Sequence, residues 1–319
     1  MKAIGVDLGG SHVMAALVDE AGTIQFRHEI DIEDHTFASV VDLVSDTIRT
    51  VLSKAGQSTM PPVGIGSPGN VDLASGTVRY SPNFGWTDVP LGAELARKLG
   101  TSVRVGNDAR CATLGEHTFG SGKGLDNFVL LTLGTGIGGG IVAAGTLLIG
   151  NGFGAGEIGH HQIRATDGFV CACTKTGCFE AQASGLGLLR HAFAVAPSFP
   201  RSTLLEGKRA KLGSKAIRKA AEVGDPHATA AWGRYVDDLA IGVANIIAFV
   251  DPAVIALGGG VSSAGDFLLD AVRPKVDAAT TMVPRGGTRV VAAMLGNDAG
   301  AVGASVMARR GGLTTKDAA

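Results

Sequence analysis

The sequence predicts an α/β protein with two domains, each built on a mixed sheet flanked by helices. At 319 residues the chain is long enough for two domains of ordinary size. Short apolar segments alternate along it with longer segments in which apolar residues have helical spacing, a pattern typical of α/β architectures. A strand, a glycine turn and a second strand occur near the N-terminus and again near residue 130, so we also expect an internal duplication.

Expected elements of the first domain follow from the spacing of apolar residues. Apolar runs end at Asp7, Val18 and Phe26 and predict a meander of strands. From Phe37 to Leu52 the apolar residues recur on one helical face. Further elements of this domain are expected as strands at 63–65 and 103–105 and a helix at 109–117.

The second domain is expected to repeat this alternation. A strand at 128–133 leads into Gly134-Thr135-Gly136 and then into a second strand at 140–144. Later elements are expected as a helix at 227–250, strands at 253–257 and 289–295, and a closing helix at 298–309.

Charge and hydropathy exclude several classes of partner. The chain has 28 Lys and Arg against 29 Asp and Glu, so no basic surface for nucleic acid or for an anionic membrane is expected. The N-terminal apolar run is too short for a signal peptide, and no run of about 18 apolar residues predicts a membrane helix. We therefore expect a cytoplasmic protein that binds small molecules.

Two glycine turns between strands are candidate phosphate sites. Gly9-Gly10-Ser11 and Gly134-Thr135-Gly136 each offer backbone N–H groups and a hydroxyl where no Cβ hinders an approaching anion, although a plain tight turn would use the same residues. The second turn matches the dinucleotide fingerprint G-x-G-x-x-G by letter, but no helical pattern follows it, so a dehydrogenase is not predicted. A Walker-type phosphate loop is also absent from the sequence.

Asp108 is a candidate general base. It follows Asn107 at the carboxyl end of a predicted strand, where α/β proteins gather ligands. A carboxylate there could take a proton from a hydroxyl that attacks a phosphate, and the alternative is that Asn107 or Asp108 only caps the following helix.

Cysteines are clustered in a way that predicts a metal site. Cys171, Cys173 and Cys178 offer thiolates within one short segment, and His160 or His161 can supply the fourth ligand of a tetrahedral zinc ion. The alternative is a set of reduced thiols. Cys111, far from this segment, is expected to lie on a helix and to face the protein core.

Taken together, these motifs resemble those of the ROK family of bacterial sugar kinases and sugar-responsive repressors. Asp7 to Ser11 resembles the first phosphate motif, Leu133 to Gly136 the second, and Gly258-Gly259-Gly260 the adenosine motif. Glu157-Ile158-Gly159-His160 with the cysteine run resembles the family signature. The resemblance implies an actin-like ATPase fold of the ribonuclease H-like type, with sugar and ATP meeting in an interdomain cleft that closes on the sugar.

The resemblance also implies roles for residues. Asp108 would be the base, Asp7 would help to place Mg²⁺ and phosphate, and His160 would be the histidine ligand of a structural zinc ion. Sugar hydroxyls would be bound by Asn83, Asn107, Asp108, Glu157, His160 and Glu180. ATP and Mg²⁺ would be bound by Asp7, Gly9, Gly10, Ser11, Gly134, Thr135, Gly136, Gly258, Gly259 and Gly260. The implied domains are a small one at 1–117, joined by the C-terminal helix at 298–319, and a large one at 118–297 with the zinc loop.

Within this family a kinase is expected rather than a repressor, because the first phosphate motif begins almost at residue 1 and no basic face is predicted. Glucose is the expected substrate, since Asn83 to Trp86 resembles the glucokinase stretch. Other hexoses or N-acetylhexosamines, a polyphosphate donor, or a sugar sensor without catalysis remain alternatives. Assembly as a homodimer or homotetramer is expected from relatives.

Two residues depart from the family pattern. Ser11 replaces the commoner threonine but keeps the hydroxyl, so phosphate binding should survive. Thr174 stands directly after the second cysteine, where the family usually has glycine. A threonine forced to a positive φ there would be strained and would loosen the zinc loop.

Overall fold

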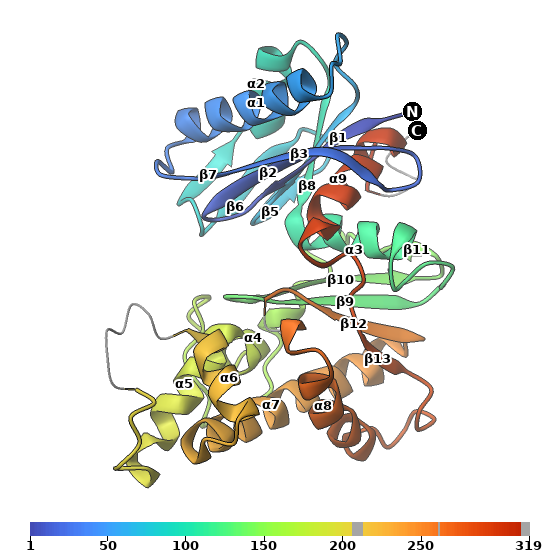
Figure 1. The fold of residues 1–319 in the computed structure, drawn as a ribbon. Helices are drawn as coiled ribbons and strands as arrows, with labels where there is room; N and C mark the ends of the chain where they lie inside the picture. The colour runs from blue at the N-terminus through green and yellow to red at the C-terminus, as the bar shows by residue number, and fades with distance from the viewer. Residues whose placement is uncertain (206–212, 261, 314–319) are drawn as a thin grey trace. The chain divides into compact units, whose positions relative to one another are not determined.

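A computed structural model describes residues 1–205, 213–260 and 262–313 of the chain (Figure 1). Two compact units are present, and each is made of segments that are separate in the sequence. The first unit comprises 1–126, 140–156 and 294–319, and the second comprises 127–139 and 157–293. The domain boundaries expected from the sequence stay a prediction. Among the described residues, no helix combines the length and apolar character needed to cross a membrane.

A five-stranded sheet forms the centre of the first unit, in the order β3-β2-β1-β4-β8. Its strands are β1 (Ala3–Leu8), β2 (His12–Val18), β3 (Ile24–Asp31), β4 (Val63–Ser67) and β8 (Val103–Asn107). The first three strands are antiparallel neighbours, whereas β1, β4 and β8 run parallel. The parallel strands therefore end at one edge of the sheet.

Helices cover both faces of this sheet, as the alternation along β2 shows. Val13, Ala15 and Leu17 join a core with α1, while Met14, Ala16 and Val18 pack against Ala301 of α9. Figure 1 shows α1 and α2 on one face and α9 on the other. The helices of this unit are α1 (Phe37–Lys54), α2 (Leu91–Leu99), α3 (Asp108–Phe119) and α9 (Ala299–Arg310).

Close approach of α9 depends on glycine. A Cβ at Gly5 of β1 would collide with the Ala301 carbonyl, and one at Gly64 of β4 with the Ala304 carbonyl. Gly303 likewise leaves no room for a Cβ beside the Cys111 carbonyl of α3. This backbone-to-backbone packing fixes the C-terminal helix on the first sheet and on α3.

A second, three-stranded sheet in this unit was not predicted from the sequence. It has the order β5-β6-β7 and consists of β5 (Asn70–Asp72), β6 (Thr77–Ser81) and β7 (Trp86–Val89). The turn between β6 and β7 carries Asn83. These short strands are rich in polar residues and so give no apolar run that would mark them in the sequence.

The second unit is built around the other five-stranded sheet, in the order β11-β10-β9-β12-β13. Strand β10 begins in this unit and continues into the first, to which β11 also belongs. The strands are β9 (Phe128–Leu133), β10 (Ile137–Ala143), β11 (Thr146–Leu147), β12 (Val254–Gly258) and β13 (Arg289–Ala292). The helices are α4 (Phe179–Ala183), α5 (Gly185–Val195), α6 (Ser214–Glu222), α7 (Pro226–Val250) and α8 (Asp266–Ala279).

Both sheets follow one plan. In each, antiparallel strands joined by a glycine turn are followed by two parallel strands, β4 and β8 in one and β12 and β13 in the other. This repetition agrees with the expected duplication and confirms the predicted α/β class. The helix expected at 227–250 is α7, and the strand expected at 140–144 begins earlier, at Ile137.

Candidate active site and metal cluster

Acidic residues of the first unit lie where its parallel strands end. The register aligns Asp7 of β1 with Gly66 of β4 and Gly66 with Gly106 of β8, so Asn107 and Asp108 follow at the same edge. A Cβ at Gly66 would lie 3.3 Å from the Asp108 Cα. Carboxylates therefore gather at the sheet edge that binds ligands in α/β proteins.

The carboxyl group of Asp7 is strongly perturbed. Burial, followed by the charges of Asp108 and Glu29, raises the pKa of Asp7 from its ordinary value of 3.8 to about 7. A nearby cation would lower this pKa again, because it favours the charged carboxylate.

Asn107 takes the helix-capping role that the sequence left open between it and Asp108. The Asn107 side chain caps α3, since its Oδ1 accepts from the Arg110 N–H at 3.1 Å. Its Nδ2 donates to the Gly69 carbonyl and, at 2.9 Å, to Asp108 Oδ1. Asp108 Oδ1 also accepts from the Ala109 N–H at 2.8 Å, and its side chain is partly exposed. The helix cap is Asn107, so Asp108 is not needed for that role.

The first glycine turn packs against the turn that carries Asn83. Gly9 closes the turn by donating its N–H to the His12 carbonyl at 2.9 Å, and Ser11 is exposed. A Cβ at Gly10 would lie 2.8 Å from Asn83 Nδ2, so only glycine lets these two predicted site residues approach. The His35 ring bonds the Gly10 carbonyl at 2.9 Å, a contact that sequence reasoning missed.

Arg110 is a second residue of this region that sequence reasoning missed. It lies on α3 after Asp108, is only 2 % exposed, and donates from Nε to the Ala155 carbonyl at 2.8 Å. Residue 155 lies in the segment that leads along the chain to Glu157. The helix that begins with Asp108 therefore also holds this segment in place.

In the second unit, the second glycine turn and the predicted adenosine motif are neighbours. Strands β9 and β12 are parallel, with Thr132 opposite Gly258, so both motifs follow at one sheet edge. Gly259 has φ +83°, and a Cβ there would lie 2.7 Å from the Leu133 carbonyl oxygen. The structure thus brings together two glycine segments that are more than a hundred residues apart.

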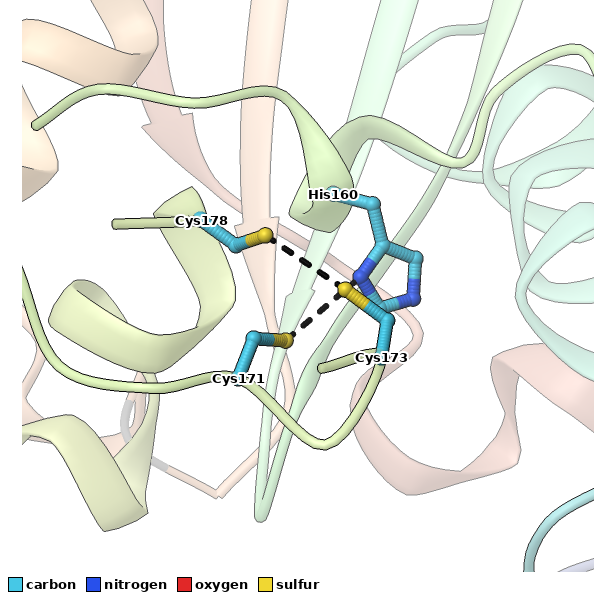
Figure 2. Close-up of side chains that lie close together, drawn as sticks. All are labelled: His160, Cys171, Cys173 and Cys178. Atoms are coloured by element: carbon cyan, nitrogen blue, oxygen red, sulfur yellow. Dashed lines mark hydrogen bonds between the residues drawn. The ribbon is translucent and has the colours of Figure 1, made fainter. Parts of the chain in front are cut away.

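His160, Cys171, Cys173 and Cys178 converge on one point (Figure 2). Their ligand atoms all lie within 4.8 Å of one another, with Cys171 Sγ 3.7 Å from His160 Nδ1 and Cys173 Sγ 3.5 Å from Cys178 Sγ. A tetrahedral zinc ion with ordinary bond lengths separates its ligand atoms by roughly 3.5–3.8 Å. The donor set fits such an ion.

Local structure explains how the four side chains meet. His160 ends a short 3₁₀ turn, Ile158–His160, and Cys178 directly precedes α4. Burial raises the pKa of the Cys171 thiol to about 12, so a bound cation would be needed to hold it as thiolate at neutral pH.

His161 lies outside the cluster. Its Nδ1 lies 2.6 Å from the Ile158 carbonyl oxygen, and its ring packs on Phe179 at 5.2 Å between centroids. Burial lowers the pKa of this imidazole. Of the two histidines proposed from the sequence, the cluster contains His160.

Thr174 does adopt the left-handed conformation that its position requires, with φ +72°. Its N–H donates to the Cys171 carbonyl at 3.0 Å, and the Cys171 N–H donates to the Lys175 carbonyl at 2.8 Å. Val170 and Thr176 pair across this small hairpin. Glycine is the usual residue where such a turn rejoins its strand.

The remaining predicted sugar residues belong to both units. Asn83, Asn107 and Asp108 lie in the first, and Glu157, His160 and Glu180 in the second. Glu157 precedes the 3₁₀ turn of His160. Glu180, on α4, has Oε1 3.5 Å from Cys171 Sγ, so it adjoins the cysteine cluster.

Comparison with known proteins gives consistent results. The ROK family model matches residues 3–311. A glucokinase of Thermotoga maritima is 40% identical over 96% of this chain and 96% of its own, and the xylose repressor of Bacillus subtilis is 29% identical over 95% of this chain and 75% of its own. The crystal structure of an ROK family glucokinase from Streptomyces griseus, in complex with glucose and AMPPNP, has a TM-score of 0.86 and 35% identity, and the match covers 97% of this chain and all of that one.

Proposed function

Because the chain belongs to the ROK family, we propose that it is an ATP-dependent hexose kinase that converts glucose to glucose 6-phosphate. The observation that carries this proposal is the pair of carboxylates, Asp7 and Asp108, at the ends of β1 and β8, two parallel strands on either side of β4, beside a glycine turn. The glucokinases at 35–40% identity over nearly the whole chain support the same activity.

Asp108 would act as the general base. Its carboxylate accepts the proton of the sugar 6-hydroxyl while that oxygen bonds to the γ-phosphorus of ATP and the bond from this phosphorus to the β,γ-bridging oxygen breaks, releasing ADP. Asn107 Nδ2 holds Asp108 Oδ1 at 2.9 Å, which fixes the carboxylate.

Binding of ATP would use the glycine turns. Backbone N–H groups and hydroxyls of Ser11 and Thr135 suit phosphate oxygens, and Gly258 to Gly260 would bind the nucleoside. Asp7 would hold Mg²⁺, which neutralises charge on the phosphates when bound. The AMPPNP in the Streptomyces griseus structure supports ATP as donor over polyphosphate.

Sugar hydroxyls would be bound by Asn83, Asn107 and Asp108 from the first unit and by Glu157, His160 and Glu180 from the second. Glucose is proposed as the preferred sugar because relatives that are 40% and 36% identical over 96% of this chain are named glucokinases. Other hexoses and N-acetylhexosamines are the competing substrates, and differences at one hydroxyl separate them.

A structural zinc ion would be held by His160, Cys171, Cys173 and Cys178, since their mutual distances suit a tetrahedral site. The ion would keep His160 and the start of α4 together, and it would act on catalysis only by holding sugar-binding residues in place. Assembly into a homodimer or homotetramer is also proposed, and light scattering on the purified protein tests it.

The decisive experiment is a coupled assay of ADP release with ATP and Mg²⁺ against a panel of hexoses and N-acetylhexosamines. D108N preserves the shape of the side chain and removes the base, so kcat should fall by at least about a hundredfold while sugar binding is kept. Wild-type turnover that is highest with N-acetylglucosamine would overturn the glucose assignment. Sugar binding without turnover in the wild-type protein would replace the kinase by a sensor.

A further inference from the structure

Glu180 contacts the second glycine turn as well as the cysteine cluster. Its Oε2 accepts a hydrogen bond from the Ile137 N–H at 3.0 Å. A Cβ at Gly136 would overlap the same oxygen. The carboxylate therefore occupies the space where a side chain at residue 136 would lie, and it fixes the residue that ends the turn and starts β10.

The other end of the turn is held by the first residue of α5. Gly185, the first residue of α5, donates its N–H to the Gly134 carbonyl at 2.8 Å. Within the turn, the Gly134 N–H donates to the Gly136 carbonyl at 3.0 Å. Residues of α4 and α5 thus fix the turn at Gly134 and at Ile137, while Thr135 at its tip is exposed.

Glu180 therefore lies between parts of the proposed site with different ligands. Its Oε2 bonds the turn assigned to ATP phosphates, and its Oε1 is 3.5 Å from Cys171 Sγ of the metal cluster. A carboxylate has about four acceptor positions, so these contacts leave room for a sugar hydroxyl.

We propose that Glu180 is a positioning residue for the nucleotide as well as a sugar ligand, so that the hydrogen bond from Ile137 to its carboxylate couples the binding of sugar and ATP. The proposal rests on the kinase assignment for the identity of the ligands. A sugar that orders the carboxylate would order the phosphate turn, and by reciprocity a bound nucleotide would tighten sugar binding to the same degree.

Binding of AMPPNP with Mg²⁺, measured by calorimetry without sugar, tests the positioning role separately from catalysis. E180A removes the acceptor for the Ile137 N–H and should weaken AMPPNP binding about tenfold. E180Q keeps an oxygen at this place and should restore most of the affinity, although it loses the charge. The comparison variant is E157Q, which changes the other carboxylate assigned to sugar in this unit and should weaken glucose binding while changing AMPPNP affinity less than threefold.

A double variant tests the contact itself. G136A places a methyl group against Glu180 Oε2 and should weaken AMPPNP binding, whereas in the E180A background the methyl group has room and should cost nothing further. Gly136 does not have a positive φ, so alanine suits its backbone. Additive losses in G136A/E180A would contradict the proposed contact.

Other results would overturn the proposal without touching the kinase assignment. If E180A and E180Q both bind AMPPNP like the wild-type protein but bind glucose weakly, Glu180 is a sugar ligand only. If AMPPNP affinity falls only in proportion to the zinc lost from each variant, the effect belongs to the metal cluster. Failure of the kinase assignment would instead appear as absent turnover in the wild-type protein.

Discussion

Replacing Thr174 with glycine should stabilise the hairpin that carries Cys171 and Cys173. Thr174 has φ +72°, a conformation that side chains with a branched Cβ rarely adopt. Its side chain is exposed, so the substitution removes no core packing.

The size of the gain follows from two opposing effects. An L-residue in the left-handed region costs roughly 1–2 kcal/mol, and threonine belongs at the upper end of that range. Glycine loses about 0.5–1 kcal/mol more backbone entropy on folding. The net gain should be about 1–1.5 kcal/mol in the free energy of unfolding, which corresponds to a zinc affinity roughly 5- to 13-fold higher if the hairpin opens when zinc leaves.

Urea unfolding of the zinc-loaded protein and chelator competition measure these quantities. T176G is the matched control, because Thr176 lies in the same hairpin, does not have a positive φ, and is half-buried. The same chemical change should there lower stability by about 0.5–1 kcal/mol. Equal effects of T174G and T176G, or a T174G protein less stable than the wild type, would refute the strain argument.

Three further predictions concern the first unit. Because burial and neighbouring carboxylates raise the pKa of Asp7 to about 7, the folded protein keeps a proton that the unfolded chain loses at about pH 4, so stability should fall as pH rises from about 4 to 7. D7N should flatten this dependence in thermal melts without Mg²⁺, and an unchanged slope would exclude Asp7 as its source. Buried Glu116 accepts from the N–H and hydroxyl of Ser121 at 2.8 and 2.7 Å, so E116Q should lower the free energy of unfolding in urea by about 1–3 kcal/mol. An unchanged free energy of unfolding would show that the carboxylate is dispensable. G303A forces a methyl group against the Cys111 carbonyl and should lower the free energy of unfolding by about 1–3 kcal/mol. A melting temperature equal to that of the wild type would show that α9 can shift away.

Local chemistry made much of the fold predictable. Alternating strands and helices, the repeated glycine turn and the helical face from Phe37 to Leu52 all depend on neighbouring residues, and the structure agrees with each. Residues 70–89 were missed, because their short strands are rich in polar residues and form no apolar run like those of β4 and β12.

The metal cluster shows where sequence reasoning ends. Cysteine spacing was enough to predict a metal site, because thiolates so close in sequence can reach one ion. The residues alone left His160 and His161 as alternatives. The structure decides between them because the 3₁₀ turn directs His160 towards the sulfur atoms, while His161 bonds the Ile158 carbonyl.

By itself the sequence determined the family, the α/β class and the motifs, since these are set by residue type and short-range spacing. Only the tertiary structure decided which of those residues contact one another. Glu180 and Ile137, Arg110 and Ala155, and Gly259 and Leu133 are each separated by tens of residues or more, and they meet because strand register and helix packing bring them together. Contacts of that kind leave no periodic trace in the chain, which is why the proposed coupling through Glu180 could be read only from the fold.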